Sequence, residues 1–430
     1  MLDINFIREN KELVKKATRD KQLDPAIVDK VLELDEIRRN LVSEVESLRS
    51  ERNKIAKLGK TSEAGRKIKE GLKKLEPELT KVEAEYKEAA YQIPNLASSD
   101  TPVGKDETEN KVIRKWGRPQ KLSFKPKDHV ELGELLGIID IETASRVTGA
   151  RFNYLKGDAA LLEFALVQYT FSILTDEKIL KTIADQVEKG FSAKAFVPVV
   201  PPVMIKTEVF EKMARLRPQE ERYHIVSDDL YLIGSAEHTL GPIHMDSTLS
   251  EKDLPLRYVG FSTSFRREAG SYGKDTRGIL RVHQFDKIEM ESFTTAENSL
   301  KEQDFFIAIQ EYLVQSLEIP YQIVAICIGD MGKPDFRQVD VEMWLPAQDK
   351  YRETHTSDLM TDFQARRLNT KVKRKDGKTE YVHMNDATAF AIGRTIIAIL
   401  ENYQQPDGSV VIPEVLRKWM GKEKIVPRSK

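Results

Sequence analysis

Residues 263–289 read TSFRREAGSYGKDTRGILRVHQFDKIE and carry the most information about this chain. Side chains alternate before and after a charged loop that contains three glycines, which predicts two strands joined as a hairpin. In regular strands two sets of side chains share a face, namely Arg266 with Glu268, and Arg281 with Phe285 and Glu289. Such a surface can hold an anion, a flat ring and a cation, as a nucleotide together with an amino acid would require. The alternative is a solvated hairpin with a charged tip.

Length and composition limit the classes of protein to consider. A chain of 430 residues is too long for one ordinary core, so we expect two domains. Its 68 basic and 69 acidic residues leave a net charge of −1, so nucleic-acid binding would require a local patch. Cys327 is the only cysteine, which excludes an internal disulfide and a cysteine-based zinc site.

The same features predict a cytoplasmic protein. The single cysteine favours a reducing compartment. The first five residues, MLDIN, have neither the basic region nor the apolar core of a signal peptide. The most apolar run, residues 195–205, is interrupted by three prolines, so we expect no transmembrane span.

Residues 28–93 predict an antiparallel helical hairpin. Two series of mostly apolar residues advance in alternating steps of three and four, one from Val31 to Ile55 and one from Ile68 to Ile93, which is typical of a coiled coil. Leu58 to Ser62 supply the turn, with Ser62 as the expected N-cap. Pro77 lies inside the second arm, where we expect a kink or a missing hydrogen bond.

The turn end of this hairpin is strongly basic. Residues 49–74 contain ten basic and three acidic side chains, a net charge of +7 in a nearly neutral protein. This asymmetry favours binding to RNA phosphates, and the alternative is a solvated lysine-rich helix face. The predicted RNA contacts are Arg49, Arg52, Lys54, Lys57, Lys60, Arg66 and Lys67.

Several motifs together resemble one family. Motif 2 of class II aminoacyl-tRNA synthetases resembles Phe265-Arg-x-Glu268, a loop and Arg281-x-x-x-Phe285. The sequence of residues 268–285 is similar to the seryl-tRNA synthetase family in particular. Residues 196–202 and 386–404 resemble motifs 1 and 3. The resemblance extends over nearly the whole chain.

This resemblance implies an α+β fold with two domains. We expect an N-terminal tRNA-binding domain at residues 1–104, with its coiled-coil arm at about 28–93. A linker rich in Pro and Ser at residues 94–102 leads to the class II catalytic domain at 105–430. The family's catalytic domain is an antiparallel sheet, expected here with six or seven strands, flanked by helices and dimeric through motif 1.

The resemblance also implies a reaction and its residues. ATP would activate L-serine to seryl-adenylate, and the serine would pass to the 3′ end of tRNA(Ser), with selenocysteine tRNA left open as a second acceptor. Arg266 and Arg394 would be catalytic, and Glu353 and Thr356 would hold Mg²⁺. The implied ATP site is Arg266, Glu268, Arg281, Val282, Phe285, Glu353 and Arg394. The implied serine site is Ser235, Glu237, Arg266, Glu289, Asp386 and Thr388.

The chain departs from the family pattern around the expected amino-acid pocket. Asp386 stands where the family has asparagine, and Asp358 and Leu359 stand where it has Ser-Asn. His355 and Thr356 replace two serines, so one hydroxyl remains. Asp386 therefore adds a carboxylate beside the pocket.

Alternatives remain for single residues and for the whole chain. Ser235 and Glu237 alone fit a helix cap, the carboxylates of residues 340–353 fit a salt-bridged sheet edge, and Arg394 fits a structural ion pair. A ligase that charges a carrier protein would lack the long arm found here. A silent relative that binds only RNA would not need the arginines and carboxylates of the motifs.

Overall fold

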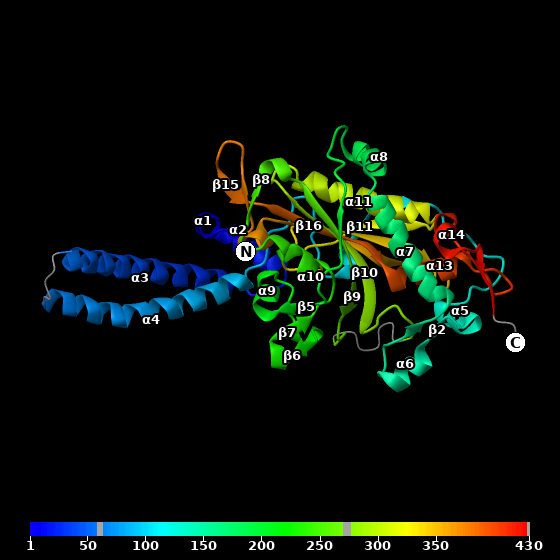
Figure 1. Cartoon of the computed structure of the whole chain (residues 1–430), viewed down its shortest axis with the longest axis horizontal. Coiled ribbons are helices and arrows are strands. Elements are labelled where there is room, and N and C mark those ends of the chain that lie inside the picture. Colours follow the sequence, from blue (N-terminus) through cyan, green and yellow to red (C-terminus); the bar gives the residue numbers. More distant parts are fainter. Residues whose placement is uncertain (58–62, 270–276, 428–430) are drawn as a thin grey trace. The chain divides into compact units, whose positions relative to one another are not determined.

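The computed structural model describes residues 1–57, 63–269 and 277–427, and the chain divides into two compact units, Met1–Ala97 and Ser98–Lys430 (Figure 1). Among the described residues, no helix is both long and apolar enough to cross a membrane.

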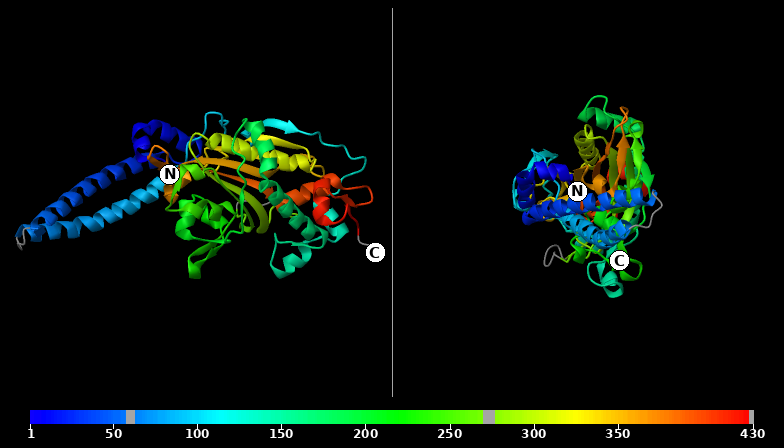
Figure 2. Two further views of the ribbon diagram at one scale, coloured as in Figure 1. Left: turned by 45° about the horizontal axis from the view of Figure 1, so that its top comes forward. Right: turned by 90° about the vertical axis from the view of Figure 1, so that its left-hand side faces the viewer.

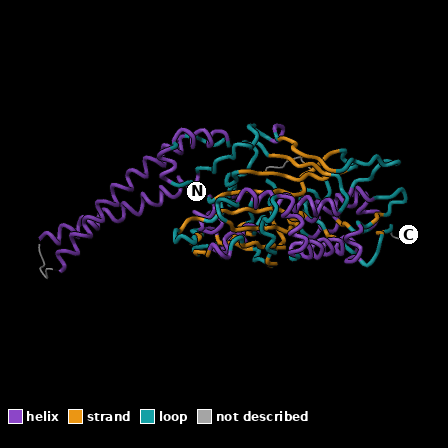
Figure 3. Tube along the Cα trace, turned by 90° about the horizontal axis from the view of Figure 1, so that it is seen from above, coloured by secondary structure: helices purple, strands orange, loops and turns teal. Residues whose placement is uncertain are grey.

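The first unit is helical, as predicted. Its elements are α1 (Ile4–Glu9), α2 (Lys11–Asp20), α3 (Ala26–Lys57) and α4 (Glu63–Gln92). Helices α3 and α4 lie side by side and antiparallel over most of their length (Figures 1 and 3). The predicted seam is confirmed: Val45, Ile68 and Leu72 are buried between the helices, with Leu48 and Leu75 packed against them.

Two details of the arm were expected from sequence. Helix α4 continues through Pro77, although proline has no N–H to donate to the preceding turn, so one backbone hydrogen bond is missing there. The turn, the expected N-cap Ser62 and the basic residue Lys60 lie outside the described residues.

The second unit is built on a sheet of eight strands among the described residues. The strands follow in the order β1 (Lys111–Trp116), β11 (Tyr321–Ala325), β12 (Arg337–Leu345), β13 (Lys350–Thr361), β16 (His383–Ala391), β10 (Gln284–Thr294), β9 (Leu256–Phe265) and β4 (Val197–Val199). All neighbours are antiparallel except β4, which runs parallel to β9. The expected six or seven strands were therefore too few, because β1 and β4 add short edge strands.

Smaller sheets and helices surround this sheet. Two of the smaller sheets have two strands each, β2 (Ile139–Asp140) with β3 (Tyr154–Leu155) and β17 (Val410–Val411) with β18 (Lys424–Ile425). The other two have three strands, in the orders β5 (Met204–Lys206), β7 (Leu230–Leu232), β6 (His224–Ile225) and β15 (Thr379–Tyr381), β14 (Lys371–Lys373), β8 (Thr248–Ser250). The helices are α5 (His129–Leu136), α6 (Ile141–Val147), α7 (Asp158–Leu174), α8 (Glu177–Val187), α9 (Thr207–Lys212), α10 (Glu237–Leu240), α11 (Ser299–Ser316), α12 (Phe363–Leu368), α13 (Ile392–Tyr403) and α14 (Glu414–Met420).

One face of the large sheet is apolar and covered by helices. Helix α11, drawn in yellow, lies along the sheet (Figure 2). Phe306 and Leu313 of α11 pack into one continuous core with Ile396 of α13 and Leu166 of α7, and all four are fully buried. Burying this face leaves the opposite face free to carry polar side chains.

Strands β13 and β16 part in the middle of the sheet, where α11 holds them together. Their ladder pairs Ser357 with Ala387 but does not continue to Thr356 and Thr388. The Gln310 side chain of α11 donates to both carbonyls that the ladder leaves without a partner, that of Thr356 at 2.7 Å and that of Thr388 at 2.8 Å. One amide thus replaces the missing ladder bond on the covered side of the sheet.

We predict that Gln310→Leu destabilises the protein. Leucine fills a similar volume but leaves two buried carbonyls without a donor, so the free energy of unfolding should fall by about 1–3 kcal/mol. Chemical denaturation measures this. Lys301→Ala, at a partly exposed position of the same helix, is the control; it removes a surface ion pair with Glu188 and should change stability by less than about 1 kcal/mol. Equal stability of Gln310→Leu and the wild type would contradict the bridging role.

Candidate active site

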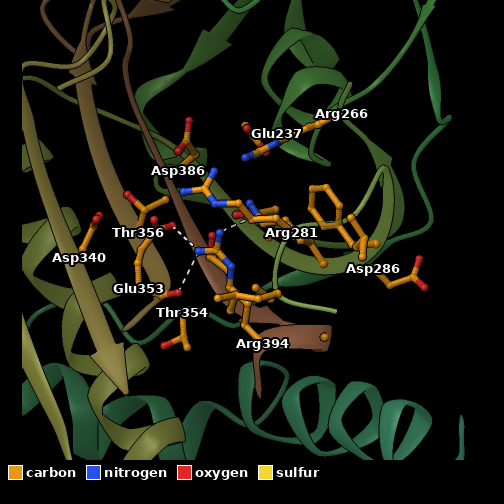
Figure 4. A pocket seen from close by; sticks show the side chains of 18 of the residues that line it. Glu237, Arg266, Arg281, Asp286, Asp340, Glu353, Thr354, Thr356, Asp386 and Arg394 are labelled. Carbon is orange, nitrogen blue, oxygen red and sulfur yellow. Dashed lines mark hydrogen bonds and ion pairs between the residues drawn. The ribbon is translucent and has the colours of Figure 1, made fainter. Parts of the chain in front are cut away.

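A cavity of about 250 Å³ opens on the polar face of the large sheet. Strands β10, β12, β13 and β16 and the start of α13 line it, and Figure 4 shows Arg266, Arg281, Arg394 and the neighbouring carboxylates gathered around it. Every residue of the predicted ATP, serine and metal sites lines this cavity except Ser235, which is fully buried and hydrogen-bonded to Glu289. The residues are Glu237, Arg266, Glu268, Arg281, Val282, Phe285, Glu289, Glu353, Thr356, Asp386, Thr388 and Arg394.

The hairpin predicted for residues 263–289 is formed, but its strands are shorter than predicted. β9 ends at Phe265 and β10 begins at Gln284, so Arg266, Glu268 and Arg281 lie beyond the regular pleat. Glu268 adopts φ 51°, a left-handed conformation that breaks strand alternation. The assumption of a regular pleat was wrong for these three residues, although all three still face the cavity.

Arginines and a ring are held together at the hairpin end. The Arg266 guanidinium lies 5.3 Å from the centre of the Phe285 ring, and its Nε donates to the Gly234 carbonyl at 3.2 Å. Arg281 Nη1 lies 3.3 Å from a Glu268 carboxylate oxygen. A positively charged, flat surface of this kind suits a nucleotide ring and its phosphates.

A second cluster is centred on Glu289. Its Oε1 accepts from the Ser235 hydroxyl at 3.1 Å and from the Thr388 hydroxyl at 3.0 Å, and it forms an ion pair with Lys287. Lys287 also donates to Ser235 at 3.0 Å. Burial raises the pKa of Glu289, against the opposing effect of Lys287.

Lys287 was missed at the sequence level. It lies two residues before Glu289 on β10, so strand alternation places both on one face. That spacing could have identified it.

Glu237 presents an ionised carboxylate with spare capacity. Burial would raise its pKa, but His238, Lys287 and Arg215 more than offset this and lower the pKa to about 2. Gly234 N donates to His238 Nδ1 at 3.1 Å, so this nitrogen is unprotonated and Nε2 carries the hydrogen that faces Glu237 at 3.4 Å. Glu237 Oε2 is buried and has no hydrogen-bond partner among the described residues. This oxygen can accept from a cation in the cavity.

Opposite these residues, Arg394 and Glu353 form an ion pair. Arg394 Nη1 lies 3.0 Å from Glu353 Oε1 and 2.8 Å from the Glu353 carbonyl oxygen (Figure 4). Burial would raise the pKa of Glu353, but Arg394 and Arg266 outweigh it, so the pKa is lowered. The structural ion pair considered for Arg394 is therefore present, at the edge of a cavity that three other arginines, Arg215, Arg266 and Arg281, also line.

Oxygen atoms gather beside this pair. Thr356 Oγ1 accepts from Gln338 at 3.3 Å and donates to Asp358 at 3.3 Å, and Asp340 Oδ1 is buried without a partner among the described residues. Glu353, Thr356 and Asp340 all line the cavity. Within residues 1–57, 63–269 and 277–427, no three His, Cys, Asp or Glu side chains lie close enough to hold a metal by themselves. The donors present fit Mg²⁺, which usually binds one or two protein oxygens together with phosphates.

Arg215 was not predicted, yet it lies at the end of the cavity near Asp386. Its Nη2 contacts Asp335 at 3.2 Å, Asp358 at 3.1 Å and Asp386 at 3.3 Å. Burial raises the pKa of Asp358 to about 8 and that of Asp386 well above its usual range, with Arg215 opposing both shifts. No local sequence pattern marks Arg215, because its partners lie 120 to 171 residues away.

Three histidines in the predicted motifs, His238, His283 and His355, lie in different surroundings. His283 Nδ1 donates to the Arg266 carbonyl at 2.9 Å, and His238 faces Glu237 as described. His355 points away from the cavity: it is buried against Phe390, and burial lowers its pKa to about 3. Its departure from the family's serine therefore changes the core beneath the site and adds no group to the cavity.

A second cavity of about 160 Å³ adjoins the first behind Phe285 and Val282. It contains two carboxyl groups, Glu163 of α7 and Asp286 of β10. Burial, together with the neighbouring Asp286, raises the pKa of Glu163 to about 8. Glu163 is therefore protonated near neutral pH.

Comparison with known proteins points to one family. A family model described as the seryl-tRNA synthetase N-terminal domain matches residues 1–97. A second model, the tRNA synthetase class II core domain (G, H, P, S and T), matches residues 222–403. The chain is 41% identical to the serine–tRNA ligase of Dictyoglomus turgidum over 441 residues, covering 100% of both chains, and 39% identical to that of Rubrobacter xylanophilus over 439 residues, covering 99% of both.

Solved structures agree with the sequence comparisons. Seryl-tRNA synthetase from Pyrococcus horikoshii, complexed with ATP, is 39% identical and superposes with a TM-score of 0.89 over 100% of both chains. The cytoplasmic serine–tRNA ligase of Naegleria fowleri, in complex with AMP, is 32% identical with a TM-score of 0.84, covering 100% of this chain and 99% of that one.

The Glu163–Asp286 pair predicts a pH dependence of stability. A carboxyl whose pKa is raised on folding contributes fully below its unfolded pKa of about 4.5, and this contribution is lost as pH rises toward about 8. Glu163→Gln keeps the shape and cannot ionise, so its stability relative to the wild type should rise between these pH values. Denaturant unfolding at several pH values measures the difference. A constant difference across this range would contradict the raised pKa of Glu163.

Proposed function

The chain belongs to the seryl-tRNA synthetase family, and from this premise we propose that it activates L-serine with ATP and transfers the serine to the 3′ end of tRNA(Ser). One observation carries the proposal most directly. A single cavity combines Arg266 over Phe285, Arg394, the ionised Glu237 and the hydroxyl-bound Glu289. These groups match the phosphates, base, ammonium and hydroxyl of ATP and serine.

The activation step requires no protein nucleophile. A serine carboxylate oxygen attacks the α-phosphorus of ATP in line, forming the acyl–phosphate bond of seryl-adenylate as the bond to pyrophosphate breaks. Arg266 binds the α-phosphate and the serine carboxylate, and Arg394 binds the γ-phosphate. Both lower the barrier by holding the reactants together and neutralising charge on the oxygens. The tRNA 3′-terminal hydroxyl then attacks the seryl carbonyl and AMP leaves.

The adenine ring binds at the end of the cavity formed by the hairpin of β9 and β10. Phe285 stacks on the adenine ring, Val282 packs beside it, and Glu268 accepts from the adenine amino group. Arg281 contacts the outer phosphates. Support for this arrangement comes from the 5.3 Å separation of Arg266 and the Phe285 ring and from the Arg281–Glu268 contact.

Serine selection follows from hydrogen bonding. Glu237 Oε2 accepts from the ammonium group, since it is a buried, ionised oxygen without a hydrogen-bond partner among the described residues. Glu289 accepts from the serine hydroxyl, with Ser235, Thr388 and Lys287 fixing its orientation. Alanine would leave Glu289 with an unmet acceptor, so it should be rejected strongly.

Mg²⁺ is the expected cofactor at Glu353 and Thr356. Both present oxygen, which this ion prefers, and Asp340 Oδ1 lies in the same cavity. When bound with ATP, the ion would supply charge neutralisation at the phosphates.

We also infer a homodimer through motif 1. Four apolar side chains of α7 and β4 and the following turn are strongly exposed: Leu161, Phe164, Val197 and Val200 at 48, 59, 54 and 85%. Leu161 and Phe164 are three residues apart and share one helix face. An exposed apolar face of this kind is typical of a subunit interface.

Serine-dependent exchange of pyrophosphate into ATP, followed by serine transfer to tRNA, tests the proposed function and separates its rivals. Exchange with serine and charging of tRNA(Ser) is the expected outcome, and Glu289→Gln should lower kcat/KM for serine at least about tenfold. Exchange without tRNA charging would favour a ligase for a carrier protein. No exchange with serine would contradict the proposal. Charging of selenocysteine tRNA is a separate arm of the assay.

The arm tip should contribute to tRNA charging only. Arg49, Arg66 and Lys67 form ion pairs with nearby glutamates, whereas Arg52, Lys54 and Lys57 are exposed and form no ion pair with any other described residue. Converting these last three to glutamate should raise the KM for tRNA at least about tenfold, because phosphate contacts become repulsive. Serine-dependent exchange should be unchanged.

The matched control reverses three exposed lysines of the catalytic unit, Lys178, Lys189 and Lys375. It alters net charge equally and should leave the KM for tRNA within about twofold of the wild type. Equal losses of exchange and charging in the arm variant would show that the tip is not an RNA contact.

A further inference from the structure

The end of the cavity near Asp386 has a concentration of acidic side chains. Asp358 and Asp386 are direct partners across β13 and β16, and Glu291 is the partner of Asp386 across β10 and β16. All three are at most 5% exposed. Carboxylates placed directly opposite one another in a sheet repel, so this row requires a compensating cation.

Arg215 supplies that cation from outside the sheet. It follows helix α9, and its backbone carbonyl accepts two hydrogen bonds from Arg222, at 3.1 and 2.8 Å. Its Nη2 reaches Asp358, Asp386 and Asp335 within 3.1–3.3 Å. The guanidinium is thus shared by two carboxylates that line the cavity and one, Asp335, that is not among the described lining residues.

The row lies one step along the strands from the serine contacts. Asp386 precedes Thr388 by two residues on β16, and Glu291 follows Glu289 by two on β10, so each pair projects from the same face. Asp386 is therefore a carboxylate beside the proposed serine contacts that the family pattern does not provide. Released from Arg215, its carboxyl oxygens would offer the substrate ammonium a second acceptor in competition with Glu237.

We propose that Arg215 is a positioning residue for serine recognition, which holds Asp386 out of the amino-acid pocket so that Glu237 alone receives the ammonium group. This inference rests on the proposed function, because it concerns the same pocket. It accounts for a carboxylate at position 386 beside an ammonium site without a change of substrate. Arg215 and Asp386 should then be replaceable together more readily than Arg215 alone.

A double-mutant cycle tests the coupling in the serine-dependent exchange assay. Arg215→Gln should raise the KM for serine at least about tenfold, because Asp386 loses its partner. The KM for ATP should stay within about twofold, since the ATP contacts lie elsewhere in the cavity. Arg215→Gln combined with Asp386→Asn should return the KM for serine to within about threefold of the wild type.

Arg215→Gln combined with Asp335→Asn is the matched control. It removes the same charge from an equally close partner, but outside the cavity, so the KM for serine should stay raised. Rescue by Asp335→Asn as good as that by Asp386→Asn would overturn the proposal, as would an unchanged KM in Arg215→Gln or additive effects at 215 and 386. If Arg215→Gln does not fold, Arg215→Lys enters the same cycle under the same criteria.

The wild-type protein separates this inference from the proposed function. Without serine-dependent exchange in the wild type, the proposed function itself fails. With exchange in the wild type and no coupling between positions 215 and 386, only the role of Arg215 fails.

Discussion

The amide of Gln310 maintains the gap on which the site depends. Strands β13 and β16 pair as far as Ser357 and Ala387 and then part, which leaves the carbonyls of Thr356 and Thr388 without ladder partners. In a covered sheet such carbonyls would be costly, and Gln310 satisfies both from helix α11. Because the hydroxyls of the same two threonines belong to the proposed metal and serine contacts, their spacing is set from beneath the sheet by a residue that does not face the cavity.

Charge balance is the second constraint. Burial on the polar face would leave several carboxylates protonated, as the raised pKa values of Glu289, Asp358 and Asp386 indicate. Lys287 forms an ion pair with Glu289, and Arg215 forms ion pairs with Asp358 and Asp386. Glu237 and Glu353 are exceptions, because cations outweigh their burial and lower both pKa values, that of Glu237 to about 2. Glu237 is therefore an ionised carboxylate with one oxygen that has no hydrogen-bond partner among the described residues, as the proposed contact with the serine ammonium requires.

Sequence reasoning succeeded where local periodicity determines structure. Strand alternation in residues 263–289 predicted the hairpin, and steps of three and four predicted the antiparallel helices α3 and α4. It failed where tertiary contacts decide. The positive φ of Glu268 ended the regular pleat early, the edge strands β1 and β4 enlarged the sheet, and Arg215 meets partners more than a hundred residues away. Lys287 was missed although strand alternation with Glu289 would have placed its side chain on the same face as the site residues.

The departures at 355, 358 and 386 have different physical meanings once their surroundings are known. His355 faces the core, where its neutral ring packs on Phe390, so its effect is on packing. Asp358 and Asp386 face the cavity and share one guanidinium, so they act as a single charged unit. Under our proposal, a carboxylate at position 386 is compatible with a serine pocket because Arg215 holds it, so Asp386 and Arg215 have to be considered together. In the proposed serine pocket, specificity depends on which carboxylate oxygens already bind a protein cation as well as on which residues are present.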